Sequence, residues 1–354
     1  MSDAAIRDGA AVIRDGETRG ATAEAGTPGG AVALSAPPLD TIAVRPARGQ
    51  WADVWVQFRQ HKGALWGAIV FGLIVLFVAI GPLIHTIDPT FTPRGRAFLT
   101  GKDIKPIYTV LWDAGAKVDW AHPLGTDNIG RDTLARLMSG GRVSIAVGIV
   151  AMLLSLVLGT LVGVLAGYFR RLDGPLMRFT DLFLALPLLP LLLVAVLLFR
   201  EPLNAAFGVE GGVFALIVLL VGITSWMQTA RIVRGDVLAL KEREFILAGR
   251  SIGTPSRRII TRHILPNVLS PIMVSATLGI ATAIITESAL SFLGFGFPPD
   301  FPTWGRLLND AVDRMVSFPE RAVWPGLLIS LTVLSVNYVG DGLRDALDPR
   351  IRGR

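Results

Sequence analysis

Six uncharged, apolar runs are the feature that most constrains what this chain can fold into. They are residues 64–84, 143–169, 182–199, 211–230, 264–286 and 322–340. A helix that crosses the hydrocarbon core of a bilayer needs about 20 residues. The third run is short, so we expect it to begin near Leu176 and to take in Asp181, and we expect the fifth to extend past Glu287 toward Leu293. The sequence therefore predicts an all-α, polytopic membrane protein with six transmembrane helices.

The composition supports this class. Of the 354 residues, 51% are hydrophobic and only 18% are charged, and the mean hydropathy is +0.54, whereas soluble domains carry about 25% charged residues. The net charge of +6 could suggest nucleic acid, but the basic residues lie beside the apolar runs, which favours membrane orientation and no nucleic acid. The absence of cysteine excludes disulfides and thiol chemistry, and the four histidines have no metal-ligand spacing.

The charges that flank the runs predict the orientation. Lys and Arg concentrate before the first run, between the second and third, between the fourth and fifth, and after the sixth. The connections 200–210 and 295–321 carry balanced charge. We expect the protein to lie in the inner membrane of the cell. The positive-inside rule then places both termini and the 231–263 connection in the cytoplasm. The long 85–142 connection, which would be outside, also carries Lys and Arg, but long loops cross largely regardless of charge.

The chain is expected to have three parts. Residues 1–49 are rich in Ala, Gly, Thr, Pro and Arg without apolar periodicity, which is typical of a disordered cytoplasmic tail. Residues 50–63 place Trp51, Val54, Trp55 and Phe58 at helical spacing, which predicts an amphipathic segment at the membrane interface. Residues 64–354 form the transmembrane domain, with an outer loop at 85–142 and a cytoplasmic loop at 231–263.

The stretch 242–267 of the cytoplasmic loop is polar and basic between two spans. Its first half has the pattern of a short amphipathic helix. Gly253-Thr254-Pro255 predicts a helix end and a new start, because Gly suits the position after a helix, Thr254 can cap the next one, and Pro suits a first turn. A second basic helix is expected over 256–264.

This stretch resembles the "EAA" coupling loop of ABC-importer permeases, in the branch that carries dipeptides, oligopeptides or nickel. The matching residues are Glu244, Ala248, Arg250, Gly253 and the run Arg-His-Ile-Leu-Pro-Asn at 262–267. Where the family has Glu-Ala-Ala, this chain has Leu247-Ala248-Gly249. Two further stretches are similar to the same family. One is His-Pro-Leu-Gly-Thr-Asp at 122–127 with Gly-Arg-Asp at 130–132, and the other comprises 287–296, 302–305 and 337–350.

The resemblance implies a permease subunit that forms half of a pathway and docks on an ATPase. The residues expected at that contact are Glu244, Ala248, Gly249, Arg250, Gly253, Arg257 and Pro266. It also implies three kinds of partner: a second homologous permease, one or two ABC ATPase subunits, and a substrate-binding protein. The chain has no Gly-x-x-x-x-Gly-Lys-Ser/Thr loop, so we expect no catalysis and no cofactor here, with ATP and Mg²⁺ held by the ATPase.

Two features within the spans point to packing and to a pathway. Gly159, Gly163 and Gly167 form a stripe of small residues that predicts close approach of a neighbouring helix. Polar groups inside spans are costly and usually face a cavity or a partner. We take Glu287, Ser288, Asn337 and Asp341 as candidates for the pathway or a subunit contact. Further polar groups in the spans are Asp181, Thr224, Gln228, Thr282 and Thr286.

Three alternatives remain at this point. The substrate can be a peptide, which we take as the default, or nickel or another small solute. A secondary transporter or channel could also have six spans, but intramembrane charges for an ion relay are sparse. An intramembrane enzyme is disfavoured because the chain has no His-Glu-x-x-His, no Ser/His pair at useful spacing and no Cys.

Overall fold

The computed structural model describes residues 50–111 and 113–347, all of them within the unit Arg48–Arg354. The predicted tail at 1–49 and the last seven residues lie outside the described residues. The described part is helical, with a single isolated β-bridge between Thr126 and Asp132. The predicted all-α fold of a polytopic membrane protein is therefore confirmed.

Helices α1 (Gln50–Gln60) and α2 (Lys62–Ile84) begin this unit and pack on the last helix, α12 (Glu320–Leu347). His61 caps α2 by accepting a hydrogen bond from the backbone N–H of Ala64 at 2.9 Å. The chain then forms two short helices at the opposite end of the bundle, α3 (Arg96–Gly101) and η2 (Ile107–Leu111). The predicted amphipathic segment thus corresponds to α1.

Helices α4 (Thr133–Tyr168), α5 (Arg170–Ala185) and α6 (Leu188–Lys241) form the next group, and α6 packs along α4. A 54-residue helix would be about 80 Å long, far more than the roughly 30 Å core of a bilayer. The backbone at Gly208 is not helical (φ 76°, ψ 168°) and interrupts α6 there. A Cβ placed on Gly212 would lie 2.6 Å from the backbone nitrogen of Asn204, so the chain folds back at this interruption.

The third predicted span is also interrupted. Helix α5 ends at Ala185, and Leu186 and Pro187 are extended before α6 begins. Five helices of the described part are long and apolar enough to cross a membrane, namely α2, α4, α6, α10 and α12. The third predicted span falls on α5 and α6, and the fourth lies within α6 beyond Gly208. The count of six spans therefore stays a prediction.

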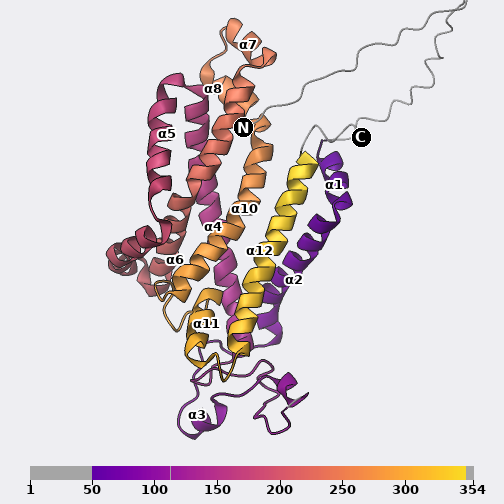
Figure 1. Ribbon diagram of the computed structural model, residues 1–354, viewed down its shortest axis with the longest axis vertical. Helices are drawn as coiled ribbons and strands as arrows, with labels where there is room; N and C mark the ends of the chain where they lie inside the picture. Colours follow the sequence, from indigo (N-terminus) through magenta and orange to yellow (C-terminus); the bar gives the residue numbers. More distant parts are fainter. Residues whose placement is uncertain (1–49, 112, 348–354) are drawn as a thin grey trace, which may run out of the picture. The chain divides into compact units, whose positions relative to one another are not determined.

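The loop after α6 contains α7 (Glu244–Ser251), α8 (Ser256–Ile259), the π-helical turn η3 (Ile260–Ile264) and α9 (Leu265–Asn267). It leads into α10 (Leu269–Phe292), which packs on α4, α6 and α12. Helices α11 (Trp304–Ala311) and η4 (Val312–Arg314) precede α12. Figure 1 shows α7 and α8 at one end of the bundle, here called the loop end, and α3 and α11 at the other, here called the far end.

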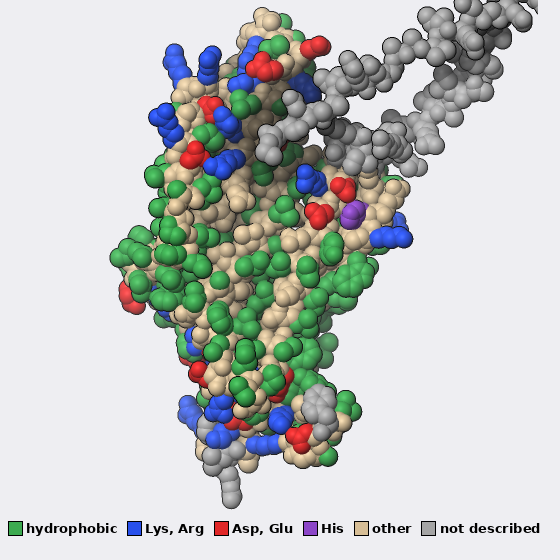
Figure 2. Space-filling view, viewed as in Figure 1, with side chains coloured by type: hydrophobic (Ala, Val, Ile, Leu, Met, Phe, Trp, Pro, Cys, Tyr) green, Lys and Arg blue, Asp and Glu red, His purple; other side chains and the backbone are tan. Residues whose placement is uncertain are grey.

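The side-chain distribution fits a membrane-embedded bundle. In Figure 2, Lys, Arg, Asp and Glu gather at the loop end and the far end, and the middle band is covered by hydrophobic side chains. Exposed Leu, Val and Ile side chains are numerous along α2, α4 and α6. Such surfaces suit lipid or a partner subunit rather than water.

Candidate functional site

The glycine stripe of α4 lies directly against the second part of α6. A Cβ on Gly159 would lie 2.7 Å from the backbone oxygen of Trp226, and one on Gly163 would lie 2.7 Å from that of Ala230. A Cβ on Gly167 would lie 2.7 Å from the side chain of Val237. Real Cβ atoms do not approach other atoms so closely, so only glycine permits this packing. The stripe thus fixes the position of the polar segment that α6 carries next to it.

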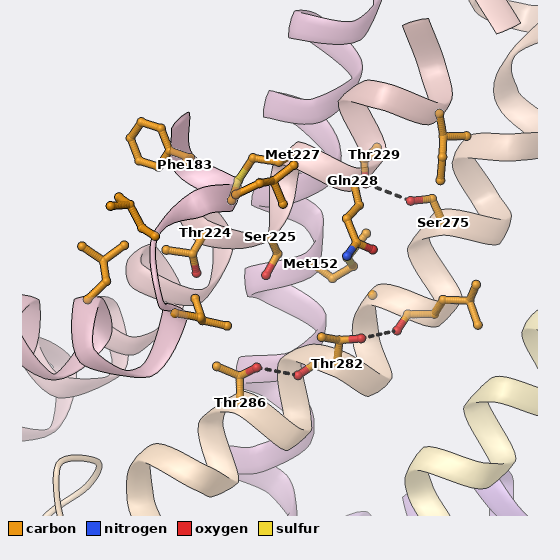
Figure 3. A pocket seen from close by; sticks show the side chains of 17 residues that line it. Met152, Phe183, Thr224, Ser225, Met227, Gln228, Thr229, Ser275, Thr282 and Thr286 are labelled. Atoms are coloured by element: carbon orange, nitrogen blue, oxygen red, sulfur yellow. Dashed lines mark hydrogen bonds between the residues drawn. The ribbon is translucent and has the colours of Figure 1, made fainter. Parts of the chain in front are cut away.

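A cavity of about 260 Å³ lies between α4, α5, α6 and α10 (Figure 3). Its hydrophobic wall includes Met152, Met227 and Phe183. The polar side chains lining it come from one stretch of α6 and one of α10: Thr224, Ser225, Gln228, Thr229, Ser275, Thr282 and Thr286. None of the lining residues carries an ionisable side chain. Four polar residues singled out in the sequence are therefore gathered around one space: Thr224, Gln228, Thr282 and Thr286.

The threonine hydroxyl protons of the cavity are already used. Thr224 donates to the backbone oxygen of Leu220 at 2.7 Å, Thr282 to that of Leu278 at 3.1 Å, and Thr286 to that of Thr282 at 2.8 Å. A hydroxyl that donates its proton still has lone pairs that can accept hydrogen bonds. These threonines therefore offer acceptor oxygens to the cavity.

Helices α6 and α10 are joined beside the cavity by a bond between the hydroxyls of Thr229 and Ser275, 2.8 Å apart. Both side chains are buried. This bond sets the spacing of the two polar stretches, as Figure 3 shows. The pair was not singled out in the sequence, because nothing there indicates that residues 46 positions apart meet.

Gln228 and Thr282 are exposed at this cavity although they lie in the middle of apolar helices. Within the described residues, the side-chain amide of Gln228 and the hydroxyl of Ser225 have no hydrogen-bond partner. Figure 3 shows both pointing into the space between α6 and α10. Polar side chains within membrane helices face a water-filled path or a partner rather than lipid. The arrangement thus defines a polar, uncharged face on the bundle.

Glu287 is placed differently from the polar residues of the cavity. Its side chain is fully buried, and it accepts hydrogen bonds from Ser144 at 3.0 Å and Ser291 at 2.7 Å. The Ser144 oxygen also accepts the backbone N–H of Trp304 at 3.3 Å. The carboxylate therefore ties α10 to α4 and α11 within this chain. It is not among the residues that line the cavity and it does not reach the surface, so a contact with a pathway or another subunit stays a prediction.

The other three predicted pathway residues are not brought together. Ser288 is buried beside Glu287, and a Cβ on Gly305 would lie 2.6 Å from the Ser288 Cα. Asn337 is partly exposed and Asp341 exposed, both in the second half of α12. A Cβ on Gly340 would lie 2.6 Å from the Thr277 hydroxyl, ten residues before Glu287 on α10. At 1.5 Å per residue, Asn337 and Asp341 thus lie roughly 10 and 17 Å along the helices from Glu287.

The turn at Gly253 ends α7 with a left-handed residue. Gly253 has φ +77°, its N–H donates to the Arg250 oxygen at 2.9 Å, and the N–H of Thr254 donates to the Gly249 oxygen at 3.0 Å. This pair of bonds is the Schellman arrangement of a helix C-terminus. The next helix has Pro255 in its cap position without a side-chain bond, so the expected capping by Thr254 is wrong.

The loop is attached to the bundle by one apolar side. Ile246 of α7 and Ile259 and Ile264 of the following turns are buried against Val233 and Val237 of α6. The Arg250 guanidinium lies 5.0 Å above the ring of Tyr168, at the end of α4. These contacts fix the loop in place and, apart from Arg250, do not involve its outer face.

The outer face of the loop is free. Seven residues are expected at an ATPase contact, and none of them is buried. Gly249 is partly exposed, and the other six are exposed: Glu244, Ala248, Arg250, Gly253, Arg257 and Pro266. Phe245, Leu247 and Ile252 are also exposed, Ile252 by 82%. Among the residues that the structure describes, Glu244 and Arg257 form no ion pair. An exposed surface of apolar and unpaired charged side chains is suited to a protein partner.

The second sequence motif forms a hydrogen-bonded turn at the far end. Asp132 caps α4 by accepting the backbone N–H of Ala135 at 2.6 Å. Its two carboxylate oxygens also bond His85 at 3.0 Å and His122 at 2.7 Å. The end of α2, the outer loop and the start of α4 are therefore held at one buried carboxylate.

A buried ion-pair network continues from this turn. Asp127 accepts hydrogen bonds from Arg131 at 2.7 Å and Arg136 at 2.8 Å, and Arg136 reaches Asp310 of α11 at 3.1 Å. Both arginines also donate to the backbone oxygen of Pro299. Sequence reasoning did not single out Arg136 or Asp310. Within the described ranges, no group of three or more His, Asp or Glu side chains is arranged so that it could hold a metal ion.

Taken together, the fold and these sites define a class: a helical membrane protein with a polar, uncharged cavity within its spans and an exposed helical loop at one end. The chain belongs to the family described as the binding-protein-dependent transport system inner membrane component, whose model matches residues 155–353. A second model, the N-terminal transmembrane domain of oligopeptide transport permease C, matches residues 49–99. The resemblance to ABC-importer permeases that the motifs indicated is thus confirmed.

Several curated relatives cover nearly all of the chain. The oligopeptide transport system permease protein OppC of Bacillus subtilis is 36% identical over 303 residues, which are 85% of this chain and 90% of the relative. The di/tripeptide transport system permease protein DppC of Pseudomonas aeruginosa is 37% identical over 324 residues, 90% of this chain and 97% of the relative. The glutathione transport system permease protein GsiD of Pectobacterium atrosepticum is 36% identical over 327 residues, which are 89% of this chain and 96% of the relative.

Proposed function

We propose that this chain is the permease subunit of an ATP-driven peptide importer and forms half of its membrane pathway. The observation that carries the proposal is the polar cavity between α6 and α10, which needs water or a substrate rather than lipid beside it. The relatives named above support peptide as the substrate, since their names refer to oligopeptides, di- and tripeptides, and glutathione. A bare nickel ion fits less well, because no histidine or carboxylate lines the cavity.

Three partners complete the proposed importer. A second permease subunit covers the exposed face of α6 and α10 and closes the pathway. One or two ATPase subunits bind the outer face of α7 and α8, and these subunits hold ATP and Mg²⁺, so this chain binds no cofactor and has no catalytic role. A substrate-binding protein delivers the peptide at the far end.

The proposed topology has six spans, with both termini and the α7–α8 loop in the cytoplasm. It is supported by the Lys and Arg residues beside the loop end. A reporter that is active only in the periplasm, fused after the C-terminal Arg354, should be silent. Activity of that fusion would overturn the topology.

Uptake by the complete importer tests the function. The two permease subunits and the ATPase subunits are purified together and reconstituted in liposomes with ATP inside. Radiolabelled trialanine and the binding protein are then added outside. We expect uptake that requires both ATP and the binding protein. Uptake without ATP would indicate a secondary transporter or channel, and no uptake of trialanine or longer peptides would overturn peptide import.

A further inference from the structure

The hydrogen-bond donors and acceptors of the polar cavity indicate which kind of ligand group it can bind. The hydroxyls of Thr224, Thr282 and Thr286 donate their protons to backbone oxygens of their own helices, so in this arrangement they offer only acceptor oxygens to a ligand. Gln228 has an unused amide, with two donor hydrogens and an acceptor oxygen. The Ser225 hydroxyl, which also lacks a partner among the described residues, can donate and accept as well. The cavity therefore offers several acceptors and two groups that both donate and accept, Gln228 and Ser225.

Few ligand groups match this set. A carboxylate only accepts hydrogen bonds, so it would find donors at Gln228 and Ser225 but would face the threonine oxygens without one. An ammonium would find no carboxylate to neutralise it. A peptide group has one N–H donor and one C=O acceptor and carries no charge. Its N–H can donate to a threonine oxygen or to the Gln228 amide oxygen, while its C=O accepts from the Gln228 NH₂ group.

We propose that Gln228 is the residue through which the permease binds the backbone amides of the passing peptide, with the acceptor oxygens of Thr224 and Thr282 beside it. This inference rests on the proposed function and adds to it a mode of recognition. The site binds the backbone amide group, which is common to all peptides. The uncharged wall, with Met152 and Met227 as its flexible apolar part, places no fixed charge against acidic or basic side chains.

The position of Gln228 suits such a role. It is exposed and has no hydrogen-bond partner among the described residues, so binding a peptide breaks no bond within the chain. The next residue, Thr229, is anchored to Ser275 at 2.8 Å, and Gly159 of α4 packs directly on this turn. The backbone that carries Gln228 is therefore fixed while its side chain stays available.

The test compares trialanine with an analogue methylated at its central backbone nitrogen, which lacks that N–H. Maximal uptake rates are measured with the complete reconstituted importer, with the binding protein saturated by each peptide in turn. Loss of one hydrogen bond is expected to slow the methylated peptide by about three- to tenfold in the wild type. In Gln228→Leu the unmodified peptide should slow, and the ratio of the two rates should fall close to one. In the matched control Ile223→Leu, an exposed position five residues earlier on α6 that does not line the cavity, the ratio should stay at the wild-type value.

Three outcomes are decisive for this experiment. A wild-type ratio near one, or an unchanged ratio in Gln228→Leu, would overturn recognition through Gln228 while leaving peptide import intact. No ATP-dependent uptake by the wild type would overturn the proposed function and this inference with it. The expected pattern of ratios supports both.

Chemical labelling provides a measurement that does not depend on transport. The sequence has no cysteine, so Gln228→Cys and Ile223→Cys each carry a single thiol. A water-soluble maleimide should label Gln228→Cys in the assembled importer, and trialanine delivered by the binding protein should slow that labelling several-fold. Ile223→Cys should show no protection. Labelling of Gln228→Cys that trialanine does not slow would overturn the site.

Discussion

The guanidinium of Arg142 on α4 donates a hydrogen bond from Nε to the backbone oxygen of Val78 on α2 at 2.6 Å. In an uninterrupted helix this oxygen would accept the N–H of residue 82. That residue is Pro82, which has no N–H. Arg142 also donates to the oxygen of Ala79 at 2.8 Å. A side chain of one span thus satisfies the backbone group that a proline leaves free in another.

The relationship between Arg142 and Pro82 can be tested by a double-mutant cycle. Arg142→Leu should destabilise the protein by about 1–3 kcal/mol, because it leaves the Val78 oxygen without a donor. In the Pro82→Ala background the new N–H bonds that oxygen, and the same substitution should cost distinctly less. Unfolding by denaturant in detergent measures all four proteins. Equal costs in both backgrounds would show that Arg142 acts through another contact.

A second prediction concerns the close packing of α4 on α6. Gly163→Leu should disrupt assembly of the complex, since even a Cβ at this position would lie 2.7 Å from the Ala230 oxygen. Gly72→Leu on α2 is the matched control, because nothing lies within 4 Å of a Cβ there. Yield and gel filtration of the purified complex measure the effect. An intact complex with Gly163→Leu would mean that the two helices separate in the assembled importer.

The third prediction separates structure from transport at Glu287. Glu287→Leu removes the acceptor of the buried Ser144 and Ser291 hydroxyls and should lower stability by about 1–3 kcal/mol for each hydroxyl left without a partner. Ser144 and Ser291 donate to different oxygens of the carboxylate. Glu287→Gln keeps an acceptor for one hydroxyl and offers the other an N–H to accept, so it should lose less stability than Glu287→Leu. Thermal unfolding of the purified complex provides the comparison. If Glu287→Leu is as stable as Glu287→Gln but fails in uptake, the carboxylate acts in transport after all.

The sequence predicted those features that depend on local patterns. Apolar run lengths indicated the spans, and Gly253 before Thr254-Pro255 predicted the helix end that the structure has. The third span was only partly predicted. Pro187 interrupts the apolar run and could have indicated the break between α5 and α6, but the run's hydrophobicity alone does not reveal it.

Long-range partners could not be predicted in this way. Glu287 meets Ser144 across 143 residues, and no local pattern indicates that a carboxylate in a span will be enclosed rather than exposed. For the same reason, the sequence did not favour Gln228, which is uncharged, over Glu287, although Gln228 lines the polar cavity and Glu287 does not. The chemistry of an intramembrane polar residue depends on which face of the helix it occupies in the assembled bundle.

The last prediction concerns coupling between the exposed loop and the ATPase. Gly253 has φ +77°, and nothing lies within 4 Å of a Cβ built on it, so this chain itself leaves room for a side chain. Asn and Asp both tolerate the left-handed conformation better than other residues and have nearly the same shape. Gly253→Asn therefore tests the bulk of a side chain at the proposed contact, and Gly253→Asp adds an unmatched charge that must lose its water on docking. Both variants should insert in the membrane normally.

We expect Gly253→Asp to lower co-purification of the ATPase and to abolish the stimulation of ATP hydrolysis by peptide-loaded binding protein. Gly253→Asn should be less affected. If Gly253→Asp retains wild-type stimulation and wild-type co-purification, the outer face of α7 and α8 is an ordinary surface loop, and the ATPase must bind elsewhere on the chain.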